Sequence, residues 1–131
     1  MSKPILCLDF DGVVNSYKSG WQGVDAIPDP PTEGFFEWLA TAMPHFRIVI
    51  FSSRSSSEDA RKSMQGWLWM HYREWRGTDP DAPVIPIEKI EFPANKPPAL
   101  ITIDDRAINF TGNWTDFDPE QLLNFKPWNK R

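Results

Sequence analysis

The chain has 131 residues, which suits one domain with an ordinary hydrophobic core and is too short for two. Its formal net charge of −4 argues against bulk electrostatic binding of nucleic acid, although a local basic patch is compatible with it. No apolar run could span a bilayer and the N-terminus lacks a signal-peptide form, so we expect a cytoplasmic protein without membrane association. Cys7 is the single cysteine, which excludes an internal disulfide.

The first third of the chain predicts a strand, a long loop and a helix. The run from Pro4 to Leu8 is continuously apolar, as buried parallel strands are. Residues 12–31 contain three glycines and three prolines and are predicted to form a loop, which at this length is usually functional in a compact domain. Thr32 is predicted to cap a helix that extends to about Met43.

The same alternation continues along the rest of the chain. Residues 46–51 are predicted to form a second buried strand, and a helix capped by Ser56 or Ser57 is predicted to reach about Trp75. Trp69 and Tyr72 lie off the apolar stripe of this helix and are either exposed or in additional core contacts. Three further elements are predicted: a short strand at 84–87, a clearer strand at 100–103 and a short helix beginning at 118–120.

Strands that alternate with helices predict a single α/β domain over residues 1–131 with a mostly parallel sheet. In such sheets, ligands bind beyond the carboxyl ends of the strands. We expect three strand ends to converge on one edge of the sheet, and each carries reactive polar residues: Asp9 and Asp11, Ser52, and Asp104 and Asp105.

Together with Lys96, these strand ends resemble the four motifs of the haloacid dehalogenase-like phosphohydrolases. The resemblance extends over residues 5–114, and four motifs in the family's order form a strong signal although each is weak alone. It implies a three-layer Rossmann-like fold with a mostly parallel central sheet. Only one helix separates Asp11 from Ser52, and one helix with a short strand separates Ser52 from Lys96. We therefore expect a capless member with an open site, over which the 12–31 loop acts as a flap.

The resemblance implies a magnesium-dependent phosphomonoester hydrolase that forms an aspartyl phosphate. Asp9 is the expected nucleophile, and Asp11 is expected to protonate the leaving oxygen and then to deprotonate the hydrolytic water. The expected Mg²⁺ ligands are oxygens of Asp9, Asp104 and the backbone carbonyl of Asp11, with Asp105 supporting the metal through water or orienting Lys96.

The phosphoryl oxygens are expected to be held by Ser52 and Lys96. Ser52 competes with its neighbours, of which Ser53 is a further substrate-binding candidate, and its alternative role is to cap the following helix. Lys89 is the rival of Lys96, which we favour because two prolines lead from it directly into the 100–103 strand.

Arg54 extends the resemblance to the phosphatase module of polynucleotide kinases, in which a serine-x-arginine at this point helps to bind substrate phosphate. Its alternative role is that of a surface arginine at the start of a helix. Arg106 either reaches a substrate or pairs with a local carboxylate, and Trp21 in the flap is expected to close over a substrate. The expected partner is thus a phosphorylated substrate, with nucleic-acid ends among the options, bound to a monomer or a homodimer.

Two other classes of function stay open. The first is a non-catalytic protein that binds phosphate or nucleic acid on the same fold. The second is a receiver-type phosphoacceptor domain, which the order of motifs disfavours because receivers place the acidic pair early and the phosphoacceptor in mid-chain. The pattern does not name the substrate.

Overall fold

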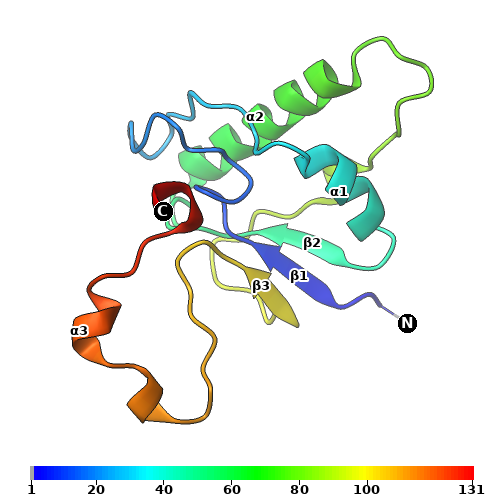
Figure 1. The fold of residues 1–131 in the computed structure, drawn as a ribbon. Helices are drawn as coiled ribbons and strands as arrows, with labels where there is room; N and C mark the ends of the chain where they lie inside the picture. Colours follow the sequence, from blue (N-terminus) through cyan, green and yellow to red (C-terminus); the bar gives the residue numbers. More distant parts are fainter. Residues whose placement is uncertain (1) are drawn as a thin grey trace.

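The computed structural model describes residues 2–131 and contains a three-stranded sheet in which all strands are parallel (Figure 1). The strands are β1 (Ile5–Leu8), β2 (Arg47–Ile50) and β3 (Ile101–Ile103), in the spatial order β2-β1-β3. Leu8 at the end of β1 is paired with the last residue of both neighbours. The predicted α/β class is therefore confirmed, and the carboxyl ends of all three strands lie level with one another.

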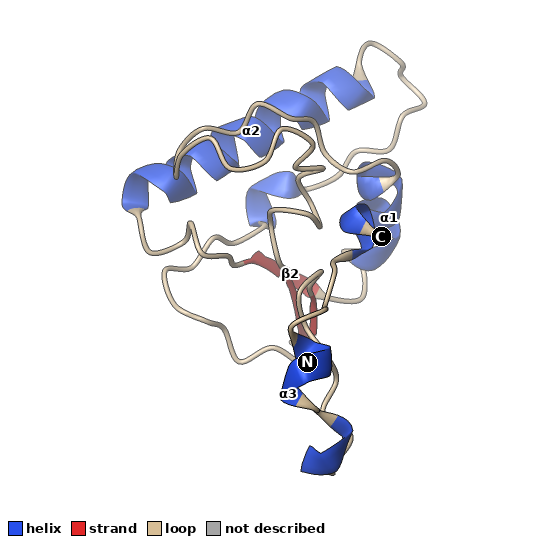
Figure 2. Ribbon diagram, turned by 60° about the vertical axis from the view of Figure 1, so that its left-hand side comes forward, coloured by secondary structure: helices blue, strands red, loops and turns tan. Residues whose placement is uncertain are grey.

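Two helices, α1 (Phe35–Ala42) and α2 (Glu58–Arg76), pack on one face of the sheet (Figures 1 and 2). Apolar side chains at helical spacing explain the packing of α2, and Ser57 caps this helix as predicted by accepting a hydrogen bond from the backbone N–H of Ala60. The core between sheet and helices includes these buried side chains: Leu6, Leu8, Phe10, Leu39, Ile48, Ile50, Met64 and Leu68.

The packed core has two layers. A helical layer on the opposite face, which a three-layer fold requires, is not shown among residues 2–131. In the same part of the chain, no helix combines the length and the apolar character needed to cross a membrane. Of the two residues predicted to be either exposed or in additional core contacts, Trp69 is exposed and Tyr72 is buried. The Tyr72 hydroxyl accepts a hydrogen bond from the N–H of Ile85.

The start of α1 differs from the prediction. Thr32 does not cap the helix, because its hydroxyl donates to the backbone carbonyl of Val13 at 2.7 Å. The N-cap is Gly34, whose φ of 85° lies in the left-handed region that glycine adopts without steric cost. Thr32 instead joins the end of the 12–31 loop to its beginning.

The strand predicted at 84–87 is wrong. The prolines within and before this segment lack the N–H groups of a regular ladder, and the chain forms a short 3₁₀ helix, η1 (Ile87–Lys89). The outer edge of β2 is bridged farther along, by Glu91. Its N–H donates to the carbonyl of Ile48 at 3.2 Å, and its carbonyl accepts from the N–H of Ile50 at 2.9 Å.

Beyond β3, residues 104–131 form a segment that we call the C-terminal arm. It runs away from the helices before it returns toward the body (Figures 1 and 2). Asp118 caps its short helix as predicted. The return is fixed by Trp128, whose indole Nε1 donates to the carbonyl of Gly12 at 2.7 Å. The arm contains three short elements: η2 (Trp114–Asp116), α3 (Pro119–Leu122) and η3 (Trp128–Lys130).

Candidate active site

Three carboxylates meet where β1 and β3 end. One oxygen each of Asp9, Asp104 and Asp105 lies within 4.8 Å of the others. The parallel register explains this meeting, because the backbone N–H of Asp9 donates to the carbonyl of Ile103 at 3.0 Å and so extends the ladder by one step. The predicted convergence of these two strand ends is therefore confirmed.

Asp9 lies in an environment that disfavours its negative charge. The pKa of its carboxyl group rises from the ordinary 3.8 to about 8. Burial is the largest cause, followed by hydrogen bonding with Asp105 and by the negative charge of Asp104. Without a cation, this group keeps its proton at neutral pH.

Gly12 allows the close approach of Asp105 to the end of β1. A Cβ atom at position 12 would lie 2.2 Å from Asp105 Oδ2, which no real contact permits. The φ of Gly12 is also +83°, in the left-handed region. Both the backbone conformation and the space beside it therefore require glycine.

The donor set fits a hard divalent cation. Carboxylate and carbonyl oxygens are the ligands that Mg²⁺ prefers. Within residues 2–131, Asp105 Oδ1 is buried without a hydrogen-bond partner, and no hydrogen bond uses the backbone carbonyl of Asp11. A buried oxygen without a partner is costly unless something compensates it, and a cation held by Asp9, Asp104, Asp105 and the Asp11 carbonyl would do so.

The side chain of Asp11 is held in a network of its own. Both carboxylate oxygens accept hydrogen bonds from Arg54, Oδ2 from Nε at 2.9 Å and Oδ1 from Nη2 at 3.1 Å. Asn15 Nδ2 also donates to Oδ1 at 2.9 Å. This fork-shaped pairing fixes the orientation of the Asp11 carboxylate.

Arg54 is buried, with only 1% of its surface exposed, so its alternative role as a surface arginine is wrong. Besides Asp11, its guanidinium bonds the flap, where Nη1 donates to the carbonyls of Gly23 and Val24 at 2.9 and 2.8 Å. The ring of Trp21 lies over it, with its centroid 4.7 Å from Cζ. Arg54 therefore joins the flap to Asp11, and its predicted contact with substrate phosphate stays a prediction.

The 12–31 loop is confirmed as a loop, and several hydrogen bonds fix it to itself. The N–H of Ser16 donates to the carbonyl of Pro30 at 3.0 Å, and Ser19 donates twice to the buried carboxylate of Asp29. Trp21 is exposed near its tip. The loop thus presents an aromatic face on a defined backbone.

Ser52 closes a turn after β2. Its hydroxyl accepts a hydrogen bond from the N–H of Arg54 at 3.1 Å, and its own N–H donates to Ser55 Oγ at 2.9 Å. The alternative in which Ser52 caps the following helix is wrong, because Ser57 does so. Ser52 is buried and Ser53 is exposed, and neither is hydrogen-bonded to the three carboxylates within residues 2–131.

Lys96 is exposed and lies within electrostatic range of this end of β1. Burial raises the pKa of the Cys7 thiol and a hydrogen bond with Thr102 opposes the rise. The charges of Asp9 and Asp104 raise this pKa further, whereas that of Lys96 lowers it. The charge of Lys96 therefore acts on the same end of β1 as the charges of the cluster, which supports Lys96 over its rival Lys89 in η1.

Arg106 pairs with local carboxylates, which is the second of the two roles predicted for it. Its backbone N–H donates to Asp104 Oδ1 at 2.8 Å, and its guanidinium Nε lies 3.9 Å from Asp105 Oδ2. The guanidinium is exposed to solvent, so it remains able to meet an anion at the mouth of the site.

Two residues that position the site were not identified from the sequence. Asn15 is buried and fixes Asp11 through Nδ2, while its Oδ1 accepts the N–H of Tyr17 at 3.2 Å. Asp29 is buried within the flap, and its backbone carbonyl accepts a hydrogen bond from Trp67 Nε1 at 2.8 Å. The spacing of four residues between Asp11 and Asn15, across a glycine turn, is the signal that could have found the first.

Comparisons of the chain with protein-family models, with curated proteins and with solved structures found no match.

Proposed function

We propose that the chain is a capless phosphomonoester hydrolase of the haloacid dehalogenase-like type, built on that family's Rossmann-like fold and dependent on Mg²⁺. The observation that carries the proposal is the meeting of Asp9 with the Asp104–Asp105 pair at adjacent strand ends. A carboxylate in the nucleophile position beside a second acidic pair has little structural use, because burial of like charges is destabilising. The arrangement suits a site in which a cation and a phosphate complete the charge balance.

In the proposed reaction, an oxygen of Asp9 bonds to phosphorus as the bond to the leaving oxygen breaks, and Asp11 donates a proton to that oxygen. Asp11 then accepts a proton from water while the water oxygen attacks phosphorus and releases the Asp9 carboxylate. Mg²⁺ held by Asp9, Asp104, Asp105 and the Asp11 carbonyl would neutralise charge on the phosphoryl oxygens.

The Asp11–Arg54 pair adds one requirement to this scheme. Among the described residues, Oδ1 accepts hydrogen bonds from Arg54 and Asn15, whereas Oδ2 accepts only the bond from Arg54 Nε and keeps a free lone pair. The proton that is exchanged with the leaving oxygen and then with water must therefore be carried on this lone pair of Oδ2.

Groups around the cluster are suited to hold the phosphate. Lys96 brings a positive charge to this end of the sheet, and Ser52 brings a hydroxyl group from β2. Ser53 follows Ser52 in the sequence and Arg106 follows Asp105, and both are exposed. These two residues complete the set of proposed phosphate contacts.

An exposed aromatic ring supports a bulky substrate. Trp21 lies on Arg54, which in turn bonds Asp11, so its ring is one side chain away from the proposed acid and base. Bases of single-stranded nucleic acid stack on such rings regardless of sequence. A 3′-phosphorylated oligonucleotide is therefore expected to react much faster than a small sugar phosphate, and equal rates on both would remove the nucleic-acid substrate from the proposal.

The reaction is tested by phosphate release from an aryl phosphate with and without Mg²⁺. The wild type should release phosphate only with the metal, and Asp9→Asn should reduce the rate by about 10³-fold or more, because an amide does not form the covalent intermediate. Asp81→Asn, which changes an exposed carboxylate of the loop after α2, is the matched control and should retain full activity.

Full activity in Asp9→Asn would refute the nucleophile, and an inactive wild type would refute the phosphatase. Beryllium fluoride, which binds a carboxylate as a mimic of an aspartyl phosphate, then separates the two remaining alternatives. Its Mg²⁺-coupled binding to an inactive wild type would support a receiver-type phosphoacceptor, and the absence of coupled binding would support a non-catalytic protein.

A further inference from the structure

We propose that the chain forms a two-fold symmetric dimer in which the C-terminal arm of each copy packs against the β3 flank of the other. The β3 flank is the exposed apolar surface made by Trp38, Ile101 and Ile103. The inference is independent of the proposed enzymatic function.

The β3 flank belongs to the core-facing side of the sheet, where the two helices do not cover it. Ile101 and Ile103 pair in register with Leu6 and Leu8 and therefore point to the same face of the sheet. On this face, the isoleucines of β2 are at most 1% exposed, whereas Ile101 and Ile103 are 55% and 42% exposed. Ile101 and Ile103 thus lie on the apolar, core-facing side of the sheet, but no helix covers them.

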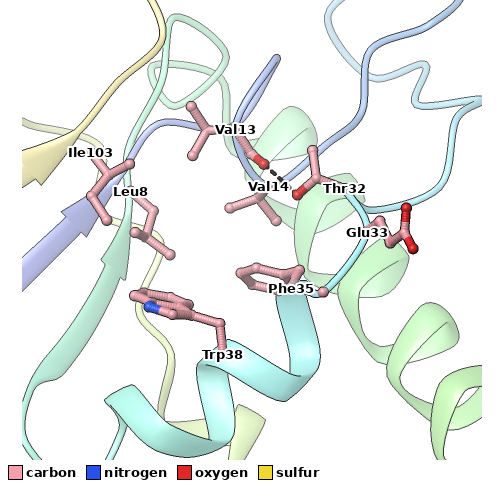
Figure 3. Close-up of a pocket in the computed structure, with 9 residues that line it drawn as sticks. Leu8, Val13, Val14, Thr32, Glu33, Phe35, Trp38 and Ile103 are labelled. Atoms are coloured by element: carbon pink, nitrogen blue, oxygen red, sulfur yellow. Dashed lines mark hydrogen bonds between the residues drawn. The ribbon is translucent and has the colours of Figure 1, made fainter. Parts of the chain in front are cut away.

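An open apolar cavity continues the β3 flank toward α1. It has a volume of about 210 Å³ and lies between Ile103 and Leu8 on the sheet and Trp38 and Phe35 on the helix (Figure 3). Figure 3 shows the Trp38 ring facing Leu8 and Ile103 across it. The cavity is wide enough to receive an apolar side chain of another surface.

The C-terminal arm carries an apolar surface of its own. Trp114 is 79% exposed and Leu123 is 86% exposed. Phe110 packs on Trp114 and on Phe117, with ring centroids 4.9 and 5.5 Å apart. The aromatic side chains of the arm are therefore ordered by one another, which lowers the entropic cost of binding.

The exposed area is what a stable dimer requires. The flank and the arm together expose on the order of 1,000 Å² of large apolar side chain, at 150–250 Å² for a fully exposed aromatic ring. A specific interface buries about 800 Å² on each partner. The summed apolar area of the flank and the arm therefore reaches the amount that one side of an interface needs.

The second copy is the fitting occupant because one chain provides both surfaces and cannot join them itself. The arm begins at Asp104 and Asp105 in the acidic cluster and ends at Trp128 on Gly12, so both of its ends are fixed to the body while its middle projects (Figure 1). A two-fold axis places each arm on the other copy's flank and covers both, at little cost.

Sedimentation equilibrium of the full chain from roughly 1 to 100 μM tests the proposal, and the wild type should be dimeric at the upper end. Leu123→Glu on the arm and Ile101→Glu on the flank should each weaken association at least tenfold. Val84→Glu is the control, because Val84 is exposed to a similar degree in the loop after α2 and should leave association unchanged. Circular dichroism and melting temperature check that each variant is folded.

A mixing experiment identifies which surfaces meet. In a mixture of Leu123→Glu with Ile101→Glu, an intact arm of one variant can meet an intact flank of the other, so a heterodimer should form that neither variant forms alone. A wild type that stays monomeric throughout, a control as disruptive as the two variants, or the absence of a heterodimer would each overturn the proposal.

Discussion

Asp9→Asn should stabilise the metal-free protein, and increasingly so as the pH rises. The folded state holds the Asp9 carboxyl at a pKa of about 8 against an ordinary 3.8. Well below pH 3.8 both states are protonated and no penalty exists. Between pH 4 and 8 the unfolded state releases its proton and the folded state keeps it, so the wild type loses stability as the pH rises.

The full shift would correspond to about 6 kcal/mol, since each pKa unit is worth about 1.4 kcal/mol. Asp9 retains contact with solvent, which screens its interactions, so we expect about 3 kcal/mol at pH 8. Asparagine has a similar shape without the titrating group and should remove this pH dependence. The substitution that abolishes the proposed activity should therefore raise stability.

The assay is urea unfolding in EDTA at intervals from pH 4 to pH 9, for the wild type, Asp9→Asn and the control Asp81→Asn. The free energies of unfolding of wild type and Asp9→Asn should lie closest at pH 4 and diverge toward pH 8, whereas the control should follow the wild type. Added Mg²⁺ should stabilise the wild type by about 2.7 kcal/mol at a hundredfold excess over its dissociation constant, and Asp9→Asn much less. Parallel pH profiles for the wild type and Asp9→Asn would refute the account of the cluster.

Two further substitutions test how the site is built. Gly12→Ala places a Cβ against Asp105 and strains a left-handed backbone, so it should lower the free energy of unfolding by about 1–3 kcal/mol and weaken Mg²⁺ binding. Urea unfolding measures the first effect and isothermal titration with the metal the second. Unchanged metal affinity would contradict the close approach of Asp105 to Gly12. Arg54→Met removes the charged partner of the Asp11 carboxylate and should lower the free energy of unfolding in urea by about 3–5 kcal/mol. The matched control Arg47→Ala removes an exposed ion pair and should barely move the urea midpoint. Equal effects of the two substitutions would show that the burial of Arg54 does not matter.

The strands were predictable because each is a mostly apolar run that is followed by a polar residue. The parallel register then brings the residue after β1 next to those after β3, which is why Asp9 and the pair Asp104–Asp105 could be expected together. The error at 84–87 has a related cause, because apolar content alone does not provide the N–H groups that a ladder needs.

The environment of Arg54 could not be predicted from the sequence. A serine-rich stretch after a strand is typical of an exposed turn, and the burial of Arg54 depends on a loop that precedes it by some thirty residues. Tertiary contacts of this kind leave no periodic pattern. For the same reason the role of Asn15 was missed, although it stands only four residues from Asp11.

The position of β1 at the centre of the sheet has a consequence for synthesis of the chain. Its neighbour β3 leaves the ribosome after β2 and both packed helices, and contacts between segments far apart in the sequence close large loops and form slowly. A nascent chain can pair β1 with β2 and bury most of its core while Asp9 still lacks both acidic partners. The proposed cation site is therefore completed only after β3 has been synthesised, and a chain truncated before β3 would contain most of the fold without the cluster of three carboxylates.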